Sequence, residues 1–323
     1  MNRKIFYQIL KWFRYQGLIG YSFALIVLKI YRGSLYFLFD DKVFLKMAFF
    51  RFQGYKLNLD NPQNLNEKLQ WLKLNDRRSL NTIFADKFLV RSYIAKHFGS
   101  EYLIPLLGTA NNPRDLNMAN LPSSPFIIKP NHSCGQYLIV RDKEEIDWRK
   151  AKIDFKWWLS FNFYYVGREY QYKNIRPMLV IEKLLLTKDS KIPNDFKLTC
   201  LNGKVEFIYV SLDREGRDER LVFDRNWIEL PFEIVSRKFA GRPVPKSNVS
   251  LPQPSNLTLM IEFAERLAAS FPYLRVDFYE VDDKLFFGEI THYHSGGFRQ
   301  FNPSRYDKEF GDKMTLKSYV YED

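Results

Sequence analysis

The feature that most constrains this chain is a pair of strand-like segments near its end. Leu274–Val281 and Leu285–Thr291 are rich in β-branched and aromatic residues, and the polar tripeptide Asp282-Asp283-Lys284 lies between them. This pattern predicts a β-hairpin. We expect Val281 to pair with Leu285 across a three-residue loop. Because side chains alternate between the two faces of a strand, the register decides which of them meet.

Four polar residues share one face in that register. Asp277 lies opposite Glu289, and Arg275 lies opposite Thr291, whereas a two-residue turn would place the two acids on opposite faces. Two carboxylates beside a guanidinium suit a divalent cation with oxygen ligands, with the arginine facing phosphate. An ordinary hairpin with a cross-strand ion pair is the alternative interpretation.

The positive charge of the chain is concentrated at its beginning. The net charge is +12 over 323 residues, and residues 1–58 contain ten basic and two acidic residues, a net of +8 that leaves +4 for the rest. A nucleic-acid-binding domain would carry its basic residues on a folded face, so this distribution argues against that class. The two cysteines, Cys134 and Cys200, have no paired spacing, which argues against a disulfide scaffold and fits a reducing compartment.

The same segment is rich in aromatic residues. Phe6, Ile9, Leu10 and Phe13 recur at helical spacing. The longest mainly apolar run, Leu18–Leu28, has 11 residues, whereas crossing a bilayer takes about 20. We expect helices that lie in a membrane interface, because basic residues attract anionic headgroups and aromatic rings enter the boundary region. Helices that pack on the main domain, with solvated lysines, are the alternative.

Periodicity predicts the elements of the remaining chain. The turn cluster at 60–64 is a plausible boundary. Residues 231–256 contain five prolines and no strong period, so we expect a surface loop or a flexible insertion there. The dipeptide Asn202-Gly203 suits a type I′ turn and predicts a hairpin. The expected helices are 65–74, 86–98, 148–162 and 257–270, and the expected strands are 126–129, 137–140, 178–186, 196–201 and 205–212.

A predicted strand is followed by a loop of small polar residues. Phe126–Lys129 ends in a lysine, and residues 131–135 (Asn-His-Ser-Cys-Gly) come after the next proline. Backbone amides in such a loop can cradle phosphate, and the lysine can neutralise it. The sequence lacks the G-x-x-x-x-G-K-[ST] pattern of a Walker A motif. A plain strand–turn–strand with an exposed lysine is the alternative.

The order of these parts is more specific than any one of them. The lysine-ended strand and loop come first, a strand containing Glu182 follows, and the acid-bearing hairpin closes the set. This order resembles the ATP-grasp superfamily, and it is most similar to the TupA-like ATP-grasp family, named for teichuronopeptide biosynthesis. The resemblance runs from about residue 58 to 316 and leaves the first 58 residues outside it. The matching pieces are 66–72 (NEKLQWL), 85–87 (ADK), 127–132 (IIKPNH), 168–175 (REYQYKNI), 195–197 (DFK), 275–279 (RVDFY) and 287–291 (FGEIT).

The resemblance implies an α+β fold in which two α+β lobes hold ATP between them. It places a basic, aromatic, helical segment at 1–58, a helical lead-in with the first lobe at 59–185, and the second lobe with the metal-binding hairpin at 186–323. It also implies ATP and Mg²⁺ as cofactors.

The resemblance assigns a role to each candidate residue. Arg275 would stabilise the phosphoryl group and the tetrahedral intermediate, Lys197 would face the phosphates or the nucleobase, and we expect both to be catalytic. Glu182, with the backbone that follows it, would hold the adenine. The expected ATP-binding residues are Lys87, Lys129, Asn131, His132, Ser133, Gly135, Glu182, Leu184 and Lys197, and the expected metal ligands are Asp277, Glu289 and Thr291.

Two places depart from the family pattern. Thr291 stands where many ATP-grasp proteins have an asparagine, which is a stronger ligand. Ser133 and Cys134 replace small residues of an Asn-His-Gly-Ser-Gly loop, so the loop is expected to be stiffer or to bind less tightly. His292 and His294 could orient an acceptor or act as a base; packing at the end of a strand is the alternative.

These implications define the expected function. A carboxylate is a poor acyl donor until ATP converts it to an acyl phosphate, which an amine attacks to give an amide, ADP and phosphate. Lysines, an arginine and Mg²⁺ would neutralise the charges that meet in such a site. We expect an ATP-dependent carboxylate–amine ligase that modifies a uronic acid or similar carboxylate in cell-surface polysaccharide synthesis, for example of a capsule. The alternatives are a phosphotransferase or glycosyltransferase acting on glycan, and a non-catalytic, membrane-associated glycan-binding protein.

The expected partners are ATP, a glycan carboxylate and an amine, without nucleic acid. The expected location is the cytoplasm, with peripheral contact to the inner face of the plasma membrane through residues 1–58.

Overall fold

A computed structural model describes residues 3–116, 121–123, 125–212, 219–236, 242–243, 246–247 and 250–316. By its internal contacts the chain divides into unit 1, which contains Met1–Leu45 and Pro105–Leu184, and unit 2, which contains Lys46–Ile104 and Leu185–Asp323. The segments predicted from the sequence end at 58 and 185, so the predicted segment 59–185 is shared between the two units. The reason is packing, because apolar side chains of residues 65–94 are buried in the cores of unit 2.

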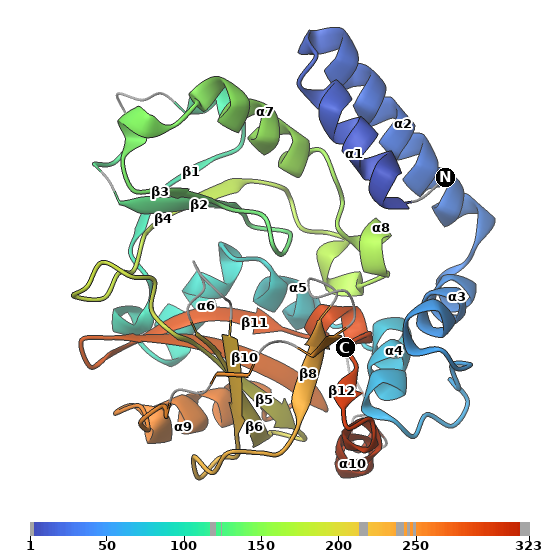
Figure 1. The fold of residues 1–323 in the computed structure, drawn as a ribbon, viewed down its shortest axis with the longest axis vertical. Helices are drawn as coiled ribbons and strands as arrows, with labels where there is room; N and C mark the ends of the chain where they lie inside the picture. Colours follow the sequence, from blue (N-terminus) through green and yellow to red (C-terminus); the bar gives the residue numbers. More distant parts are fainter. Residues whose placement is uncertain are drawn as a thin grey trace. The chain divides into compact units, whose positions relative to one another are not determined.

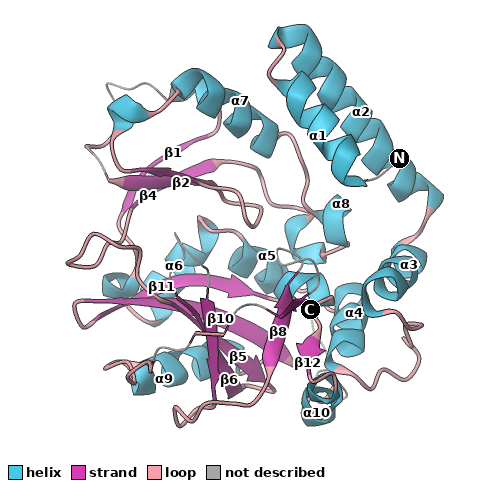
Figure 2. Cartoon of the chain, viewed as in Figure 1, coloured by secondary structure: helices cyan, strands magenta, loops and turns pink. Residues whose placement is uncertain are grey.

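Unit 1 is built on an antiparallel four-stranded sheet in the order β1-β4-β2-β3 (Figures 1 and 2). One face is buried against helix α7, where Phe126 and Ile128 of the sheet meet Phe155. Alternation along the strands places Lys129 and Glu182 together on the other face. The elements of unit 1 are α1 (Arg3–Arg14), α2 (Gly17–Leu38), β1 (Leu106–Ala110), β2 (Phe126–Pro130), β3 (Leu138–Val140), α7 (Trp148–Leu159), α8 (Tyr164–Gly167) and β4 (Leu179–Lys183).

Helices α1 and α2 lie side by side and pack on α7 (Figure 1). Leu10 and Leu28 are buried with Trp157, and Arg14 forms an ion pair with Asp154 at 2.6 Å. The N-terminal helices therefore do pack on a folded unit through one face. No helix in the described part of the chain has the length and apolar character that a membrane crossing needs.

A buried arginine fastens the start of helix α3 (Asp41–Gln53) to unit 1. The Arg168 side chain is 1 % exposed, and its Nε lies 3.5 Å from Asp41 Oδ1. Its guanidinium lies 4.6 Å from the centre of the Phe44 ring, and the Tyr164 hydroxyl donates to Asp41 Oδ2 at 2.5 Å. The first residue of the 168–175 motif is therefore an anchor for the chain that leaves α2.

Unit 2 is built on an antiparallel five-stranded sheet in the order β11-β10-β5-β6-β7 (Figure 2). One face packs against helix α9, where Leu198 and Val276 meet Phe263. Part of the other face packs against α4 and α10, where Phe207 meets Leu69. The helices are α4 (Leu65–Asn75), α5 (Ser79–Ala85), α6 (Leu89–His97), α9 (Leu257–Ala268) and α10 (Arg305–Lys313), and the strands are β5 (Asp195–Leu201), β6 (Lys204–Leu212), β7 (Glu219–Phe223), β8 (Glu233–Ser236), β9 (Arg242–Pro243), β10 (Tyr273–Val281), β11 (Lys284–Thr291) and β12 (Phe301–Asn302).

Most predicted elements are confirmed in type and position, and so is the α+β class. The predicted helices 65–74, 148–162 and 257–270 are α4, α7 and α9, and the five predicted strands are β2 to β6. Positive φ at Asn202 (47°) and Gly203 (78°) agrees with the predicted type I′ turn. The helix predicted at 86–98 begins later, at Leu89, and α5 was not predicted.

The loop predicted at 231–256 is wrong for two of its described parts, β8 and the two-residue strand β9 that pairs with it. Residues 233–236 form strand β8, in which Ile234 pairs with Phe301 of β12. Ile234 and Phe232 are buried with Phe207 in the core of unit 2. A strand of four residues gives no readable period, and one of its two partners, β12, lies about 70 residues away in the sequence.

Candidate active site

The β10–β11 hairpin places the two predicted acids on one face, but its turn differs from the predicted one. Asp277 lies opposite Glu289 and Arg275 opposite Thr291, as expected. The predicted three-residue loop is wrong, however, because Val281 pairs with Lys284 and the turn contains only Asp282 and Asp283, both at positive φ. With that turn alone the two acids would lie on opposite faces.

A β-bulge at Gly288 restores the register. Phe278 pairs with Phe287, whereas Asp277 pairs with Glu289, so Gly288 is the extra residue. A Cβ atom at this position would lie 2.9 Å from the Asp277 carbonyl oxygen. Glycine is therefore required by the close approach of the two backbones, and this single residue places both carboxylates on one face.

Asp277 is the centre of an ion-pair network. Arg275 Nε and Nη2 donate to its two carboxylate oxygens at 2.7 Å each, and Lys197 Nζ donates to Oδ2 at 2.6 Å. The same lysine donates to Asp195 Oδ2 at 2.5 Å. Register accounts for the contact, because Lys197 of β5 lies opposite Asp277. The network joins four side chains, two from β5 and two from β10.

The charges of this network fix its protonation. Burial opposes ionisation of Asp277, which is 1 % exposed, but Arg275 and then Lys197 outweigh burial and hold the pKa of the carboxyl below its usual range. Burial likewise opposes the charge on Arg275, and the Asp277 and Glu289 carboxylates outweigh it and raise the pKa of the guanidinium. Asp277 and Arg275 are therefore both charged at neutral pH.

Glu289 is the more accessible of the two acids, with its side chain 35 % exposed. Its Oε1 lies 3.3 Å from Arg275 Nη2, and its Oε2 lies 3.9 Å from Lys87 Nζ. Lys87 follows Asp86, whose carboxylate accepts from the Phe88 backbone N–H at 2.8 Å at the start of α6. The structure thus places Lys87, an expected ATP-binding residue, beside Glu289 of the hairpin.

The metal-binding potential of this cluster rests on two carboxylates. No group of three or more His, Cys, Asp or Glu residues that could hold a metal occurs among the described residues. Asp277 and Glu289 lie directly opposite each other, and Mg²⁺ is commonly held by one or two carboxylates together with substrate phosphates. Thr291 lies on the same face, opposite Arg275 and one step farther along the strand. The two acids fit Mg²⁺ on this basis.

In unit 1 the expected lysine and glutamate form a pair. Lys129 Nζ lies 2.5 Å from Glu182 Oε2, and the two side chains are 17 % and 5 % exposed. The pairing follows from register, because Glu182 lies opposite Ile127 and so shares the face of Lys129. This face is the one that α7 does not cover. The sequence reasoning had assigned the two residues separate roles and did not predict this ion pair.

Side chains of the loop at 131–135 form hydrogen bonds that fix its conformation. Asn131 accepts from the Met178 backbone N–H at 2.9 Å and donates to the Arg176 carbonyl at 3.0 Å. His132 Nε2 lies 3.0 Å from the Phe161 carbonyl. The Ser133 hydroxyl donates to Gln136 at 2.7 Å, and Asn131, His132 and Ser133 are all buried.

Gly135 is exposed and has a φ of 72°, a conformation that favours glycine. Of the loop residues predicted to bind ATP, Asn131 and His132 therefore shape the loop through their side chains, and Gly135 lies at its surface. After β4, the Leu184 backbone N–H donates to the Pro125 carbonyl at 3.3 Å, and the Leu184 side chain is buried.

The two histidines after β11 are buried. Desolvation lowers the pKa of His292 to about 4 and that of His294 well below its usual value. His294 Nδ1 lies 2.7 Å from the Tyr273 hydroxyl. Both imidazoles are neutral at pH 7, and their burial agrees with packing at the end of the strand.

Sequence reasoning missed several residues on the same face of the unit 2 sheet. Tyr209 of β6 lies opposite Lys197, and Arg220 and Arg299 both lie over its ring, at 4.9 and 5.8 Å from the ring centre. Tyr209 could have been found, since it shares the face of Lys197 across the predicted 196–212 hairpin. Arg299 lies outside the strands, so no periodic pattern in the sequence indicates its position.

The 66–72 motif also has a structural explanation. Asn66 donates its backbone and side-chain N–H groups to Asp307 Oδ1, both at 2.9 Å. Gln70 Nε2 donates to the Gly297 carbonyl at 2.6 Å, and Lys68 Nζ donates to the Gly311 carbonyl at 2.6 Å. Helix α4 thereby fastens the chain that follows β11.

Comparison with known proteins gives one match to a family. Residues 67–315 match the family model described as TupA-like ATPgrasp. No curated protein sequence matches the chain.

Solved structures give distant similarities. The chain is similar to D-alanine–D-alanine ligase from Bacillus anthracis in complex with ATP (17 % identity, TM-score 0.35, covering 65 % of this chain and 54 % of that one). It is also similar to D-alanine–D-alanine ligase from Helicobacter pylori (13 %, TM-score 0.41, 79 % and 68 %). A third is the ATP-grasp ligase PsnB with a phosphomimetic variant of its minimal precursor, Mg and ADP (10 %, TM-score 0.37, 70 % and 57 %). The chain spans about half the length of the first of these structures.

Proposed function

Because the chain belongs to the TupA-like ATP-grasp family, whose model matches residues 67–315, we propose that it is an ATP-dependent carboxylate–amine ligase. The resemblance noted in the sequence and the ATP-grasp fold that it implied are thereby confirmed. The activity joins a carboxylate to an amine through an acyl phosphate, with release of ADP and phosphate.

We assign the handling of the ATP phosphates to Lys87, Lys129 and Lys197. Lys129 of unit 1, paired with Glu182, and Lys87 and Lys197 of unit 2 all have side chains no more than 17 % exposed. Cations held in such surroundings stabilise negative charge more strongly than exposed ones. Glu182 and the backbone up to Leu184 would hold the adenine. The loop with Asn131, His132, Ser133 and Gly135 would contribute its backbone.

Asp277 and Glu289 would hold Mg²⁺, with Thr291 as a weaker additional oxygen. The ion, when bound, supplies positive charge to the phosphates. Lys197 and Arg275 keep the Asp277 carboxylate ionised and in place through bonds of 2.6 to 2.7 Å. Arg275 also reaches Glu289, so its guanidinium would stabilise negative charge that develops on the transferred phosphoryl group and on the tetrahedral adduct.

The substrate is proposed to be a uronic acid or similar carboxylate of a cell-surface polysaccharide, with an amino acid or small amine as the second substrate. Family membership supports this choice, together with the basic and aromatic N-terminal segment that would bring the enzyme to a membrane-linked glycan.

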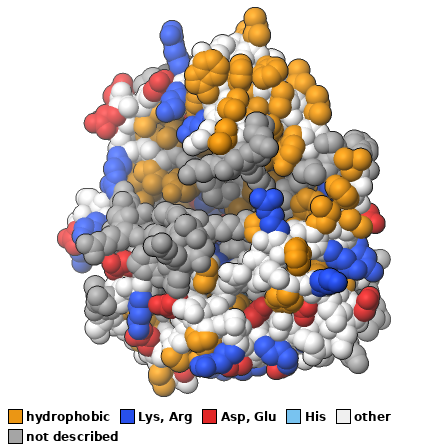
Figure 3. Space-filling model, turned by 45° about the vertical axis from the view of Figure 1, so that its right-hand side comes forward, with side chains coloured by type: hydrophobic (Ala, Val, Ile, Leu, Met, Phe, Trp, Pro, Cys, Tyr) orange, Lys and Arg blue, Asp and Glu red, His pale blue; other side chains and the backbone are white. Residues whose placement is uncertain are grey.

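Residues 1–58 are proposed to contact the membrane surface on its cytoplasmic side. Figure 3 shows hydrophobic side chains gathered at the top of the view, over α1 and α2. Leu18, Ile19 and Ile30 are 79 %, 88 % and 65 % exposed. Apolar side chains clustered on one surface mark interaction sites.

A groove of about 680 Å³ lies next to this apolar surface within unit 1. Leu18 and Tyr21 line it together with Arg114, Lys152 and Lys156, and none of the described residues that line it is acidic. Apolar and cationic side chains together suit a surface of anionic lipid.

The observation that carries the ligase proposal is the Asp277 cluster, in which two carboxylates, an arginine and two lysines share one surface of a family-defined scaffold. The test measures ADP release with D-glucuronate-containing oligosaccharide and L-glutamate, each alone and together. We expect release to require both, and Asp277→Asn to lower the rate by at least about 100-fold. The matched control is Asp283→Asn, the same change at the exposed turn of the hairpin.

The mass of the product separates the ligase from the alternatives. Loss of water between the two substrates indicates an amide, an added phosphate indicates a phosphotransferase, and an added sugar indicates a glycosyltransferase. Full activity of Asp277→Asn, or no binding of a nonhydrolysable ATP analogue with Mg²⁺ to the wild-type protein in calorimetry, would refute the ligase proposal.

A further inference from the structure

A pocket of about 680 Å³ lies beside Asp307 of α10 in unit 2. Residues from the end of α3, the start of α4, β8 and β12 line it together with Asp307. Its volume lies within the range of about 300–1,000 Å³ for ligand pockets. None of the residues assigned above to ATP or Mg²⁺ is among the described residues that line it, so the pocket is separate from the Asp277 cluster.

Asp307 is a buried carboxylate without a counter-charge. The residue is 9 % exposed, and Oδ1 accepts from the backbone and side-chain N–H groups of Asn66. Within the described part of the chain, no group donates to Oδ2 and no cation pairs with the carboxylate. Burial raises its pKa to about 6, and the bonds from Asn66 oppose this only in part, so the carboxyl is mostly ionised at pH 7. A cation bound beside Oδ2 would stabilise this charge.

A second acid makes the surroundings of the pocket more negative. Glu67 is 5 % exposed, and its carboxylate accepts from three backbone N–H groups of the segment 58–64 at distances between 2.9 and 3.2 Å. It forms no ion pair with any residue that the structure describes. Burial, followed by the charges of Asp307 and Glu67, raises the pKa of Tyr55, whose side chain lines the pocket. None of the described lining residues is basic, so the pocket is complementary to a cation.

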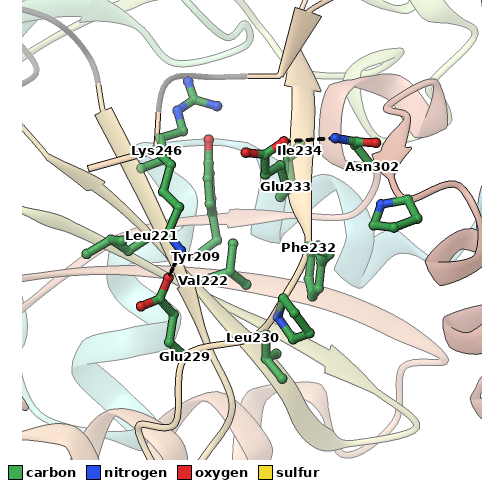
Figure 4. A pocket seen from close by; sticks show the side chains of 13 residues that line it. Tyr209, Leu221, Val222, Glu229, Leu230, Phe232, Glu233, Ile234, Lys246 and Asn302 are labelled. Carbon is green, nitrogen blue, oxygen red and sulfur yellow. Dashed lines mark hydrogen bonds and ion pairs between the residues drawn. The ribbon is translucent and has the colours of Figure 1, made fainter. Parts of the chain in front are cut away.

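The amide side chains of the pocket use nitrogen atoms for contacts within the protein. Gln300 Nε2 donates to the Phe52 carbonyl at 2.9 Å. Asn302 Nδ2 donates to Glu233 Oε2 at 2.9 Å, drawn as a dashed line in Figure 4, which shows a second pocket that Asn302 also lines. The two amide oxygens are left as acceptors. Together with Asp307 Oδ2 they match in number the three N–H donors of a primary ammonium group.

An ammonium group suits this pocket better than a guanidinium group does. A guanidinium binds a carboxylate most strongly through two parallel hydrogen bonds, one to each oxygen. Asn66 already donates twice to Oδ1 of Asp307, so only Oδ2 is open to a ligand.

The rest of the pocket fits an organic ligand with hydroxyl groups. Gln53 Nε2 is buried and has no hydrogen-bond partner among the described residues. An unpaired buried donor is costly, and a hydroxyl oxygen of a ligand would satisfy it. Tyr55 and Val235 supply apolar surface, and an aromatic ring also attracts an ammonium group.

We propose that this pocket binds a hydroxylated primary ammonium compound of the size of one amino sugar. Its ammonium group donates to Asp307 Oδ2 and to the amide oxygens of Gln300 and Asn302. One of its hydroxyls accepts from Gln53 Nε2. This inference goes beyond the proposed ligase activity and does not depend on it, because the binding requires neither ATP nor the Asp277 cluster.

The test is a ligand-observed NMR titration of the full-length protein at pH 7, in phosphate buffer without nucleotide. The probes are D-glucosamine and N-acetyl-D-glucosamine, which share the ring and its hydroxyls, and only the first carries an ammonium group. We expect the wild type to bind glucosamine at least about tenfold more tightly, because charge-assisted hydrogen bonds are about twice as strong as neutral ones. Asp307→Asn, which keeps an acceptor for Asn66, should weaken glucosamine binding about tenfold or more and leave the binding of the acetylated sugar unchanged.

The matched control is Asp312→Asn, which removes an equal charge at a 58 % exposed position of the same helix. It should bind glucosamine like the wild type. Tyr55→Ala, at a 36 % exposed position, serves as a second pocket variant if the thermal unfolding of Asp307→Asn differs from that of the wild type. Equal affinity of the wild type for the two sugars, or unchanged glucosamine binding in both pocket variants, overturns the proposal.

Two further measurements test the kind of cation and the place where it binds. Displacement of glucosamine by an equal concentration of potassium chloride would indicate a site for a bare cation and overturn the organic assignment. Loss of glucosamine binding in Asp277→Asn but not in Asp307→Asn would place the ligand at the Asp277 cluster and overturn the proposal.

Discussion

Asp307 of α10 is a buried carboxyl whose two identified hydrogen bonds both come from Asn66. Desolvation raises its pKa to about 6, and the two bonds from Asn66 oppose this only in part. An unfolded aspartate has a pKa of about 3.9. The pKa of Asp307 is higher in the folded than in the unfolded protein, so protonation of its carboxyl stabilises the folded state. This contribution to the free energy of unfolding is complete below about pH 4 and is lost as the pH rises through about 6.

We therefore expect the free energy of unfolding of the wild type, relative to Asp307→Asn, to fall by about 2 kcal/mol between pH 4 and pH 8. The amide keeps an acceptor for Asn66 and does not titrate. Urea unfolding across this range measures the difference. Asp312→Asn, at an exposed position of the same helix, is the control. A wild type and an Asp307→Asn variant with parallel pH profiles would contradict the prediction.

The placement of the charged residues on β5, β10 and β11 was easier to predict from the sequence than the role of the side chains in the 131–135 loop. Asp277, Glu289 and Lys197 meet because each occupies a defined side of a strand. Asn131 and His132 have side chains that suit phosphate binding as well as structural hydrogen bonds. Their partners, Met178 and Phe161, lie 47 and 29 residues away. Composition alone does not distinguish these two uses.

At the scale of the element, the bulge in β11 determines the site. Gly288→Ala introduces a Cβ that would lie 2.9 Å from the Asp277 carbonyl oxygen and 3.1 Å from Tyr279 Cε2. Relieving this contact has to move backbone that aligns Asp277 with Glu289. We expect a loss of about 1–3 kcal/mol in stability, as for other overpacked sites, and weaker Mg²⁺-dependent binding of an ATP analogue. Chemical unfolding and calorimetry measure the two effects.

Gly108→Ala in β1 is the matched control. A Cβ there would meet only Ile181 Cδ1, at 3.6 Å, which is an ordinary contact. We expect this variant to behave like the wild type in both measurements. Equal stability and equal Mg²⁺ dependence of the two alanine variants would show that the bulge does not control the alignment of the acids.

Elements with a strong local pattern were predicted and those without one were not. The Asn202-Gly203 turn and helices α4, α7 and α9 follow from turn chemistry and period. Helix α5 has seven residues, too few for a readable period. Strand β8 has four residues, and it is defined by its pairing with β12 and β9.

At the scale of the whole molecule, the membrane proposal makes a direct prediction. The double variant Leu18→Ser/Ile19→Ser removes two side chains that are 79 % and 88 % exposed, so its fold should be unchanged. Burying one large apolar side chain contributes about 1.5–3 kcal/mol. We therefore expect the variant to bind phosphatidylcholine vesicles containing phosphatidylglycerol more than tenfold more weakly than the wild type in a sedimentation assay.

Two comparisons make this assay specific. Ile228→Ser, at a 63 % exposed position in unit 2, should bind the vesicles like the wild type. Lys152→Glu/Lys156→Glu should lose the preference for vesicles that contain phosphatidylglycerol. If the wild-type protein stays in the supernatant with both kinds of vesicle, residues 1–58 do not act as a membrane contact.

The features of this protein that could be predicted from its sequence are local ones, namely strand alternation and turn chemistry. Alternation along the hairpin strands predicted Asp277 opposite Glu289, since this relation depends on neighbouring residues and strand geometry. Tertiary contacts define the bulge at Gly288, the burial of the 131–133 side chains, and the placement of Arg220 and Arg299 over the Tyr209 ring. These features depend on which distant segments of the chain pack together. Such packing produces no periodic pattern in the sequence, so it cannot be read from the sequence.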